Sequence, residues 1–562
     1  MSTLARPAGP AAVEVDETID LPELPDSALG KAAALLQVAA QVEHALMVQY
    51  LYAGYSFEPV QRDIADVAIE EMGHLMTVQN LLRCIGEKPY LHRQDDGADV
   101  PEDERLFPFD FRLEPLSHLS LAKYVVAESP TPQADVDPAV MAHIVDLATG
   151  AAGEPVERVG TVYALLGVVF GTPQLLLELA ANGDPWYVVV NQLAAEVAPF
   201  YGGREALHLP DSAFDPASVP GQGSDPDWHR TQAVDGFRVH VVASRRDALE
   251  ALRFIGLQGE GPSPVVGETA HFRRFYNLFT GFFGADGLGT DRPPQVKDVP
   301  AGSRIVLDPN GSGESVISHP TTVRWARLAD LRYAVLLGAL ERYLLAPVDD
   351  RAFLRGWCFA EMFALSKLAG FLRQLPRSVS APPQVAALPF TVPAWLATGG
   401  QWRDLAAAFD ESMTIARGLQ TEVAPGTDQH QLLVLLLASD ERKLGEATAR
   451  VAGTSQCTRT DAVRDVLDWA AGVGDPGHNG NSPALPNGPQ SRFWNQQHDG
   501  FVQVVMRGQN ITTPPAAGGD ALMIGMLRSK SMPRDRPPLA EASEEFRLVE
   551  RWVADGRPDD PV

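Results

Sequence analysis

Cysteine, long apolar runs and clustered basic residues are all scarce in this sequence. Its 562 residues include only three cysteines, Cys84, Cys358 and Cys457, which lie far apart and form no CxxC pair. A disulfide framework is therefore not expected, and a reducing cytoplasm fits this composition best. No run of about 18 apolar residues could span a bilayer, and the N-terminus has no signal-peptide core. We expect a soluble, cytoplasmic protein.

Basic residues are also fewer than acidic ones. Acidic residues outnumber basic ones 72 to 46, which gives a net charge of −26 at neutral pH. No Lys/Arg cluster and no alternation of aromatic and basic residues indicates a face for nucleic acid or for a membrane surface. The sequence therefore argues against both classes of partner.

Helical periodicity dominates what is present, and the predicted fold class is mainly α. At roughly 150 residues per domain, the chain is long enough for two to four units. Apolar residues recur at helical spacing over about 28–57, 60–86, 321–346 and 350–374, whereas 87–150 has mixed signals and is predicted to be a long crossover. Four regions are expected: a flexible leader at 1–27, a helical bundle at 28–290, a helical extension packing on the bundle at 291–427, and a C-terminal mixed module with long loops at 428–562.

Polar side chains occupy the apolar face of the second predicted helix. In EEMGHLMTVQNLL, residues 70–82, Glu71 and His74 share a helical face with apolar residues, whereas Glu70 is predicted to face away. On the preceding helix, Glu43 lies on an apolar stripe in the same manner. A buried, ionised carboxylate costs several kcal/mol unless a cation or a set of hydrogen bonds compensates it. Two neighbouring helices are thus each predicted to bury a glutamate against a cation.

The Glu-x-x-His spacing of Glu71 and His74 occurs again at Glu268 and His271, just before another apolar helical run. At this spacing both side chains lean to one helical face, so each pair can hold one metal ion while its glutamate bridges to a second ion. One such pair arises by chance in many helices. Two pairs together with Glu43 fit the ligand pattern of a di-metal carboxylate bundle.

Two neighbours of Glu43 have less specific interpretations. His44 falls on a different helical face and is predicted to be an ordinary polar histidine. Tyr50, two turns after Glu43, is the candidate catalytic residue because it could line a reaction cavity, with simple packing as the alternative.

Several segments in order resemble one known family. They are VEHALMVQYLYAGYSF, AIEEMGHLMTVQNLLRCIGEKPYL, ALRFIGLQGEG and ETAHFRRFYNLF. Together they resemble the ferritin-like domain of the iminophenyl-pyruvate dimer synthase family of violacein- and rebeccamycin-type bisindole pathways, over about residues 28–285. The resemblance implies a ferritin-like four-helix bundle with a non-haem centre of two iron ions, manganese being the alternative metal. It puts Glu43, Glu71, His74, Glu268 and His271 at the motif positions. Family members that dimerise an indole-pyruvate imine are much longer and haem-dependent, so their substrate does not transfer.

One expected carboxylate is missing from this pattern. Where the family commonly has an Ile-Gly-Glu-Leu-Tyr type motif, residues 159–163 read VGTVY, with Thr161 in place of the glutamate. Glu157, one turn earlier on a helix predicted to begin near Pro155, is the candidate replacement, although four residues displace it by about 6 Å. The alternative for Glu157 is a carboxylate that favours the helix N-terminus through the helix dipole. Glu260, in the QGEG turn, is a further candidate.

The hypothesis from the sequence is an O₂-dependent non-haem di-iron oxidase or oxygenase. Its substrate would be small, such as an amino-acid derivative, and its setting would be natural-product biosynthesis. A homo-oligomer or a biosynthetic partner protein is compatible with this role. The alternative, which Thr161 favours, is a degenerate ferritin-like scaffold or binding protein that holds one metal or none.

The end of the chain has a weaker signal. The segment SMPRDRPPLAEASEEFRLVERWVADGRPD faintly resembles the end of cytochrome-c-like modules, but the chain has no CxxCH for haem attachment. Met532 and Trp552 are therefore predicted to be core residues of a structural or partner-binding module.

Overall fold

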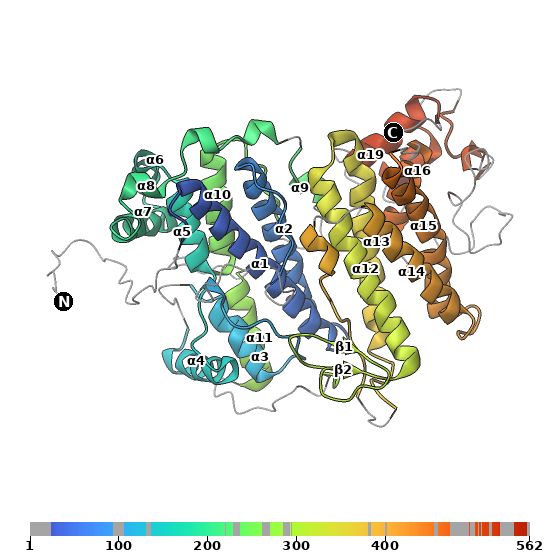
Figure 1. The fold of residues 1–562 in the computed structure, drawn as a ribbon, viewed down its shortest axis with the longest axis horizontal. Coiled ribbons are helices and arrows are strands. Elements are labelled where there is room, and N and C mark those ends of the chain that lie inside the picture. The colour runs from blue at the N-terminus through green and yellow to red at the C-terminus, as the bar shows by residue number, and fades with distance from the viewer. Residues whose placement is uncertain are drawn as a thin grey trace.

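Long helices dominate the computed structural model of the protein (Figure 1). Two groups of long helices lie beside each other, one coloured blue to green and the other yellow to orange. The prediction of a mainly α fold is confirmed. The residues that the structure describes are 24–93, 106–130, 136–219, 221–228, 236–260, 270–284, 293, 295–379, 384–398, 402–453, 459–471, 494, 501–503, 505–506, 509–515, 520–528 and 544–558.

The first two long helices pack against each other along most of their length. Helix α1 spans Ala28–Tyr55 and helix α2 spans Arg62–Cys84, close to the predicted ranges. The hydroxyl of Ser27 accepts a hydrogen bond from the backbone N–H of Gly30 at 3.0 Å and caps α1. Most of α1 is buried, because other helices cover it on several sides. This pair provides two of the four arms of the first bundle.

The third arm is built from two shorter helices. Helix α3 spans His118–Ala127 and begins with a capping box, and helix α5 spans Gly160–Phe170. The N–H of Val159 donates to the carbonyl of Ala127 at 3.3 Å, so α5 starts where α3 ends. Helix α4, Pro138–Ala152, occupies the excursion between them and packs on α3. The expectation of a mere crossover over 87–150 is therefore wrong, since α3 is part of the bundle.

The fourth arm is also interrupted. Helix α10 spans Arg245–Ile255 and continues into a π-helical turn, η4, at Gly256–Glu260. Helix α11 spans His271–Phe283 and packs on α3, while α10 packs on α5. Figure 1 shows α5 and α10 at one end of the bundle and α3 and α11 at the other. We call this assembly of α1, α2, α3 with α5, and α10 with α11 the first bundle.

Shorter elements follow α5 along the chain. They are α6 (Pro173–Ala180), α7 (Pro185–Val197), α8 (Arg204–Leu207), the 3-10 turns η2 (Asp211–Ala213) and η3 (Pro216–Ser218), and α9 (Asp225–Trp228). Figure 1 shows α6, α7 and α8 near α5, whereas α9 lies between the two bundles. Among the described residues, no single helix is long and apolar enough to cross a membrane. Helices α5 and α6 reach that length and apolarity only together, across a bend of 119°.

Four further long helices form the second bundle. They are α12 (Pro320–Leu345), α13 (Val348–Leu372), α14 (Trp402–Gln420) and α15 (Asp428–Val451). Helix α14 packs on both α12 and α15. The expected boundary at residue 427 therefore falls between two helices of one bundle. A short parallel pair of strands, β1 (Val306–Leu307) and β2 (Val316–Ile317), precedes α12.

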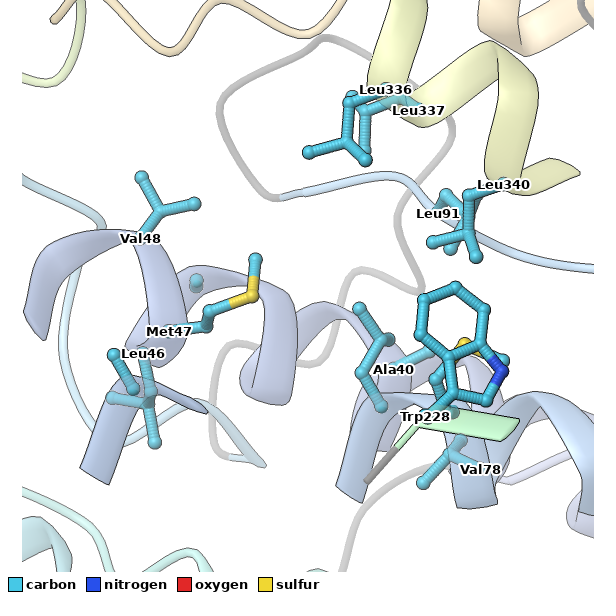
Figure 2. Packing of buried hydrophobic residues seen from close by; sticks show 14 of the residues in the cluster. Ala40, Leu46, Met47, Val48, Val78, Leu91, Trp228, Leu336, Leu337 and Leu340 are labelled. Atoms are coloured by element: carbon cyan, nitrogen blue, oxygen red, sulfur yellow. The ribbon is translucent and has the colours of Figure 1, made fainter. Parts of the chain in front are cut away.

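Apolar side chains make the two bundles continuous. Leu336, Leu337 and Leu340 of α12 face Leu91 and Trp228 across the boundary, with Ala40 of α1 and Val78 of α2 below them (Figure 2). The indole N–H of Trp228 also donates to the hydroxyl of Tyr343 at 3.1 Å. Helix α12 thus packs on the first bundle through apolar side chains and this hydrogen bond.

Near the C-terminus, the described helices are α16 (Arg459–Ala471), α18 (Leu522–Arg528) and α19 (Glu544–Ala554), with an antiparallel strand pair, β3 (Val505–Met506) and β4 (Gln509–Asn510). Helices α16 and α19 pack on α13. Trp552 is fully buried and stacks on Phe501 at 5.2 Å between ring centroids, which confirms its prediction as a core residue. Met532 lies outside the described residues.

Candidate metal centre

Five side chains from four elements converge inside the first bundle. Glu43 comes from α1, Glu71 and His74 from α2, Glu128 from the residue that caps α3, and His271 from the first residue of α11. Each side chain is at most 1% exposed. They form two groups of possible metal ligands, and within each group the ligand atoms lie within 4.8 Å of one another. Glu71 belongs to both groups.

The distances show that Glu71 lies between the two histidines. Nδ1 of His74 is 2.8 Å from Oε2 of Glu71 and 3.4 Å from Oε2 of Glu43. Nδ1 of His271 is 3.1 Å from Oε1 of Glu71 and 3.5 Å from Oε2 of Glu128. The imidazole rings are stacked with centroids 5.6 Å apart. One carboxylate therefore offers a separate oxygen to each histidine, as a bridging ligand does between two ions.

Several of these atoms are buried without a hydrogen-bond partner. They are Oε2 of Glu43, Oε1 of Glu71, Oε2 of Glu128 and Nδ1 of His271. A buried polar atom left without a partner costs roughly 1–3 kcal/mol, and more when it is charged. Carboxylate oxygens and imidazole nitrogens are the donor set of iron, manganese and zinc sites in proteins. The residues present therefore fit a bound cation, which would satisfy all four atoms.

The position of two ligands in their helices supports this assignment. Glu128 lies at the C-terminal end of α3, where the helix dipole disfavours a negative charge. His271 lies at the N-terminal end of α11, where the dipole disfavours a protonated imidazole. Both placements become favourable when a cation lies between a carboxylate and a neutral histidine.

Without a cation, protons must compensate for the crowding of the carboxylates. Burial, and then the neighbouring Glu71, raise the pKa of Glu43 to about 8. Burial alone would lower the pKa of His74, but the charges of Glu43 and Glu71 raise it to about 10. The same opposition of burial and carboxylates raises the pKa of His271 well above its ordinary value. Protons in the metal-free protein thus occupy the positions that a cation would take.

Two tyrosines hold the outer glutamates. The hydroxyl of Tyr163, from α5, donates to Oε1 of Glu43, and the hydroxyl of Tyr50, from α1, donates to Oε1 of Glu128 at 2.5 Å. Each outer glutamate therefore has one oxygen fixed by a tyrosine, while the other oxygen faces the centre. The structure places Tyr50 beside the ligands, and its catalytic role stays a prediction.

Glu157, the candidate replacement for the missing carboxylate, lies outside both groups of possible ligands. Glu157 is exposed and precedes α5, which begins at Gly160 rather than near Pro155. Thr161 is half-buried in the first turn of that helix and lies outside both ligand groups. The carboxylate in the third arm is Glu128 instead, because α3 and α5 together form that arm. The signal for it was the capping box at Ser117 followed by an apolar helical segment that ends in Glu128.

The remaining predictions for this region have separate outcomes. Glu268 and the side chain of Glu260 lie outside the described residues. His44 is fully buried, and its Nε2 pairs with the hydroxyl of Tyr333 in α12, away from the metal ligands. Glu70, which was predicted to face away from the core, is only 1% exposed, because residues 236–240 cover that side of α2.

Comparison with known proteins supports the same assignment. A family model described as ferritin-like matches residues 36–280, a range that contains all five converging side chains. Searches of curated proteins and of solved structures found no match. Residues 36–280 therefore form a ferritin-like domain, and its buried glutamates and histidines make two adjacent groups that could each hold a metal ion.

Proposed function

We propose that the ferritin-like domain is a non-haem di-iron oxidoreductase that uses O₂ to oxidise a small organic substrate, with manganese as the alternative metal. The observation that carries this proposal is the convergence of four buried, unpartnered ligand atoms on two adjacent positions that share Glu71. Two redox-active ions, when bound, would supply Lewis acidity and the electrons that reduce O₂.

The protein side chains would have distinct roles. Glu71 would bridge the two positions through its separate oxygens, and His74 and His271 would each provide a neutral nitrogen through Nδ1. Glu43 and Glu128 would be the outer ligands, held in orientation by the hydroxyls of Tyr163 and Tyr50. The burial of all five ligands keeps bulk water away, which protects reactive species and strengthens the electrostatic interactions.

The charge of the site supports an acidic substrate. Among the described residues, the ligand groups contain three carboxylates, which offset three of the four positive charges on two divalent ions. An anionic substrate, such as the carboxylate of an amino-acid derivative, would supply the remaining charge.

The second candidate function is a scaffold or binding protein that holds one metal or none. Thr161 favoured it while the third-arm carboxylate was missing, and Glu128 removes most of that support. Counting metal separates the two functions. Protein reconstituted anaerobically with Fe²⁺ is expected to hold close to two irons per chain and to change its near-ultraviolet absorption when O₂ is added. Trace iron, or two irons with no optical response to O₂, would contradict the proposed activity.

A further inference from the structure

A chain of hydrogen bonds links the outer nitrogens of the two histidines through one glutamine. Gln258 lies in the π-helical turn η4, and its Oε1 is 2.6 Å from Nε2 of His74. Its amide Nε2 donates to the carbonyl of Gly236 at 2.9 Å and to Oε2 of Glu70 at 3.1 Å. Glu70 in turn is 3.0 Å from Nε2 of His271. The histidines therefore share one outer network, separate from the carboxylates at the centre.

The direction of every hydrogen bond in this network is determined by its partners. The carbonyl of Gly236 and the carboxylate of Glu70 can only accept, so the NH₂ group of Gln258 must point at them. Oε1 of Gln258 then faces His74 and can only accept. Nε2 of His74 must therefore carry the proton, which leaves the lone pair of the neutral ring on Nδ1, facing Glu43 and Glu71.

The same reasoning determines which ring nitrogen of His271 carries the proton. Oε2 of Glu70 accepts from Nε2 of His271, while Arg274 donates to Oε1 of the same carboxylate. Arg274 forms an ion pair with Glu70 and balances its charge. The lone pair of a neutral His271 consequently lies on Nδ1, towards Glu71 and Glu128.

Two backbone features bring Gln258 into this position. The π-helical turn continues α10 beyond Ile255, and π-helical turns occur frequently at functional sites. Gly236 approaches so closely that a Cβ on it would lie 2.7 Å from Nε2 of Gln258 and would collide with the carboxylate of Glu70. The tight approach allows the carbonyl of residue 236 to orient the amide.

We propose that Gln258 is a positioning residue that sets the metal-facing nitrogen of His74 directly and contributes to that of His271 through Glu70. The inference rests on the proposed function to the extent that a metal ion is what the Nδ1 atoms bind. Outer partners of this kind fix the tautomer and ring orientation of a histidine ligand, and their loss lowers metal affinity roughly 10–100-fold. The competing interpretation is that Gln258 only stabilises η4, through its hydrogen bond to the carbonyl of Gly236.

The test is a titration of metal-free protein with Co²⁺, followed by calorimetry and by the visible absorption of the bound ion. Gln258→Met keeps the length of the side chain and removes the amide, so we expect at least one of the two binding steps to weaken roughly 10–100-fold. The absorption bands of the bound Co²⁺ should also shift, because a reoriented imidazole changes the ligand field. Glu70→Gln should weaken both steps, since an amide has one acceptor oxygen and cannot accept from Arg274 on one side and from Gln258 and His271 on the other.

Gln222→Met is the matched control. Gln222 makes the same kind of amide contacts, donating to the carbonyl of Val242 at 2.6 Å and accepting from its N–H at 2.7 Å, but it touches neither histidine. We expect it to lower the thermal midpoint without changing Co²⁺ affinity or absorption. If Gln258→Met lowers the midpoint similarly and leaves both metal readouts unchanged, Gln258 only stabilises η4 and the inference is wrong. Weakened Co²⁺ binding together with an iron-loaded protein that ignores O₂ would instead contradict the proposed function alone.

Discussion

The two helical bundles both bury carboxylates, but they compensate the negative charge in different ways. In the first bundle, Glu43, Glu71 and Glu128 face one another with histidines as their only charged partners among the described residues. In the metal-free protein, protons on Glu43 and on the histidines offset that charge. The first bundle therefore lacks fixed counter-charges at this cluster, and a cation could take the place of the protons.

The second bundle contains its own counter-charges. Arg332 makes two hydrogen bonds to Asp440, at 2.6 and 2.9 Å, and Lys443 donates to Glu361 at 2.8 Å. All four side chains are at most 2% exposed, and two positive charges balance two negative charges. Ser412 donates to Asp440 and completes the cluster. These carboxylates join α12, α13, α14 and α15 and need no ligand.

The comparison teaches that burial alone does not mark a functional carboxylate. Both Glu43 and Asp440 are 0% exposed, and burial raises the pKa of both. For Asp440 the neighbouring Arg332 opposes that rise, whereas for Glu43 the next largest influence is Glu71, which adds to it. The two carboxylates therefore differ in the sign of the neighbouring charge that affects them most.

Breaking the balanced cluster should have the largest effect on stability. Asp440→Asn leaves Arg332 without its bidentate partner in a buried site, and removal of one partner of such a pair costs roughly 3–5 kcal/mol. Urea unfolding followed by circular dichroism measures the loss. The double variant Arg332→Met/Asp440→Leu should regain much of it, because a buried ion pair can be replaced by apolar packing. Equal losses in the single and double variants would show that the pair itself contributes the stability.

Removing a histidine ligand should have the largest effect on metal binding. His74→Ala and His271→Ala each leave a coordination position that water fills poorly, so we expect affinity losses greater than the roughly 10–100-fold typical of outer partners. Inductively coupled plasma mass spectrometry on reconstituted protein measures the metal per chain. His44→Ala is the matched control, because His44 pairs with Tyr333 outside the ligand groups and should keep full occupancy. Full occupancy in both ligand variants would show that the two histidines are structural.

The sequence alone predicted some of the candidate ligands but not all of them. Glu43, Glu71, His74 and His271 were found because a helix of period 3.6 places each on an apolar face. Glu128 was missed because it ends a ten-residue helix in a segment with mixed signals, and its role depends on α5 resuming where α3 stops. No local pattern encodes such a tertiary junction.

Glu70 shows a second limit of periodicity. It was assigned to the solvent side because it lies off the apolar stripe of α2, yet Gln258, His271 and Arg274 all contact it. Helical periodicity identifies one buried face, and it cannot show that a distant irregular segment covers the opposite face. The ranges of α12 and α13, which have apolar patterns over many turns, were predicted to within a few residues.

The pH dependence of stability should sharpen the contrast between the bundles. In the folded, metal-free protein the pKa of Glu43 is raised from 4.5 to about 8 and that of His74 from 6.5 to about 10, so the folded state holds protons that the unfolded chain releases. Their stabilising contribution is complete below the unfolded values and is lost as the pH rises through the folded ones. The thermal midpoint of metal-free protein should therefore fall between about pH 5 and pH 9.

Bound metal should remove most of the pH dependence of the thermal midpoint, because a cation takes the place of the protons. Binding of Co²⁺ near neutral pH is expected to release protons from Glu43 and His74, and affinity should rise with pH. Calorimetry in two buffers of different ionisation enthalpy measures the proton release. A metal-free midpoint that does not change with pH, or binding without proton release, would contradict the account of the first bundle.

The smallest effect is expected at Glu157, which the sequence predicted as the carboxylate ligand of the third arm. Glu157 is exposed, so Glu157→Gln should leave metal content unchanged and alter the free energy of unfolding by no more than about 0.5 kcal/mol, the usual range for surface substitutions. The matched variant Glu128→Gln makes the same chemical change at a fully buried ligand, where a neutral amide keeps the shape but loses the charge that a hard cation requires. It should lose at least one ion per chain. Metal analysis of the two proteins, prepared together, decides between the positions: a loss at Glu157 with retention at Glu128 would mean that the segment before α5, rather than the end of α3, supplies the ligand of the third arm.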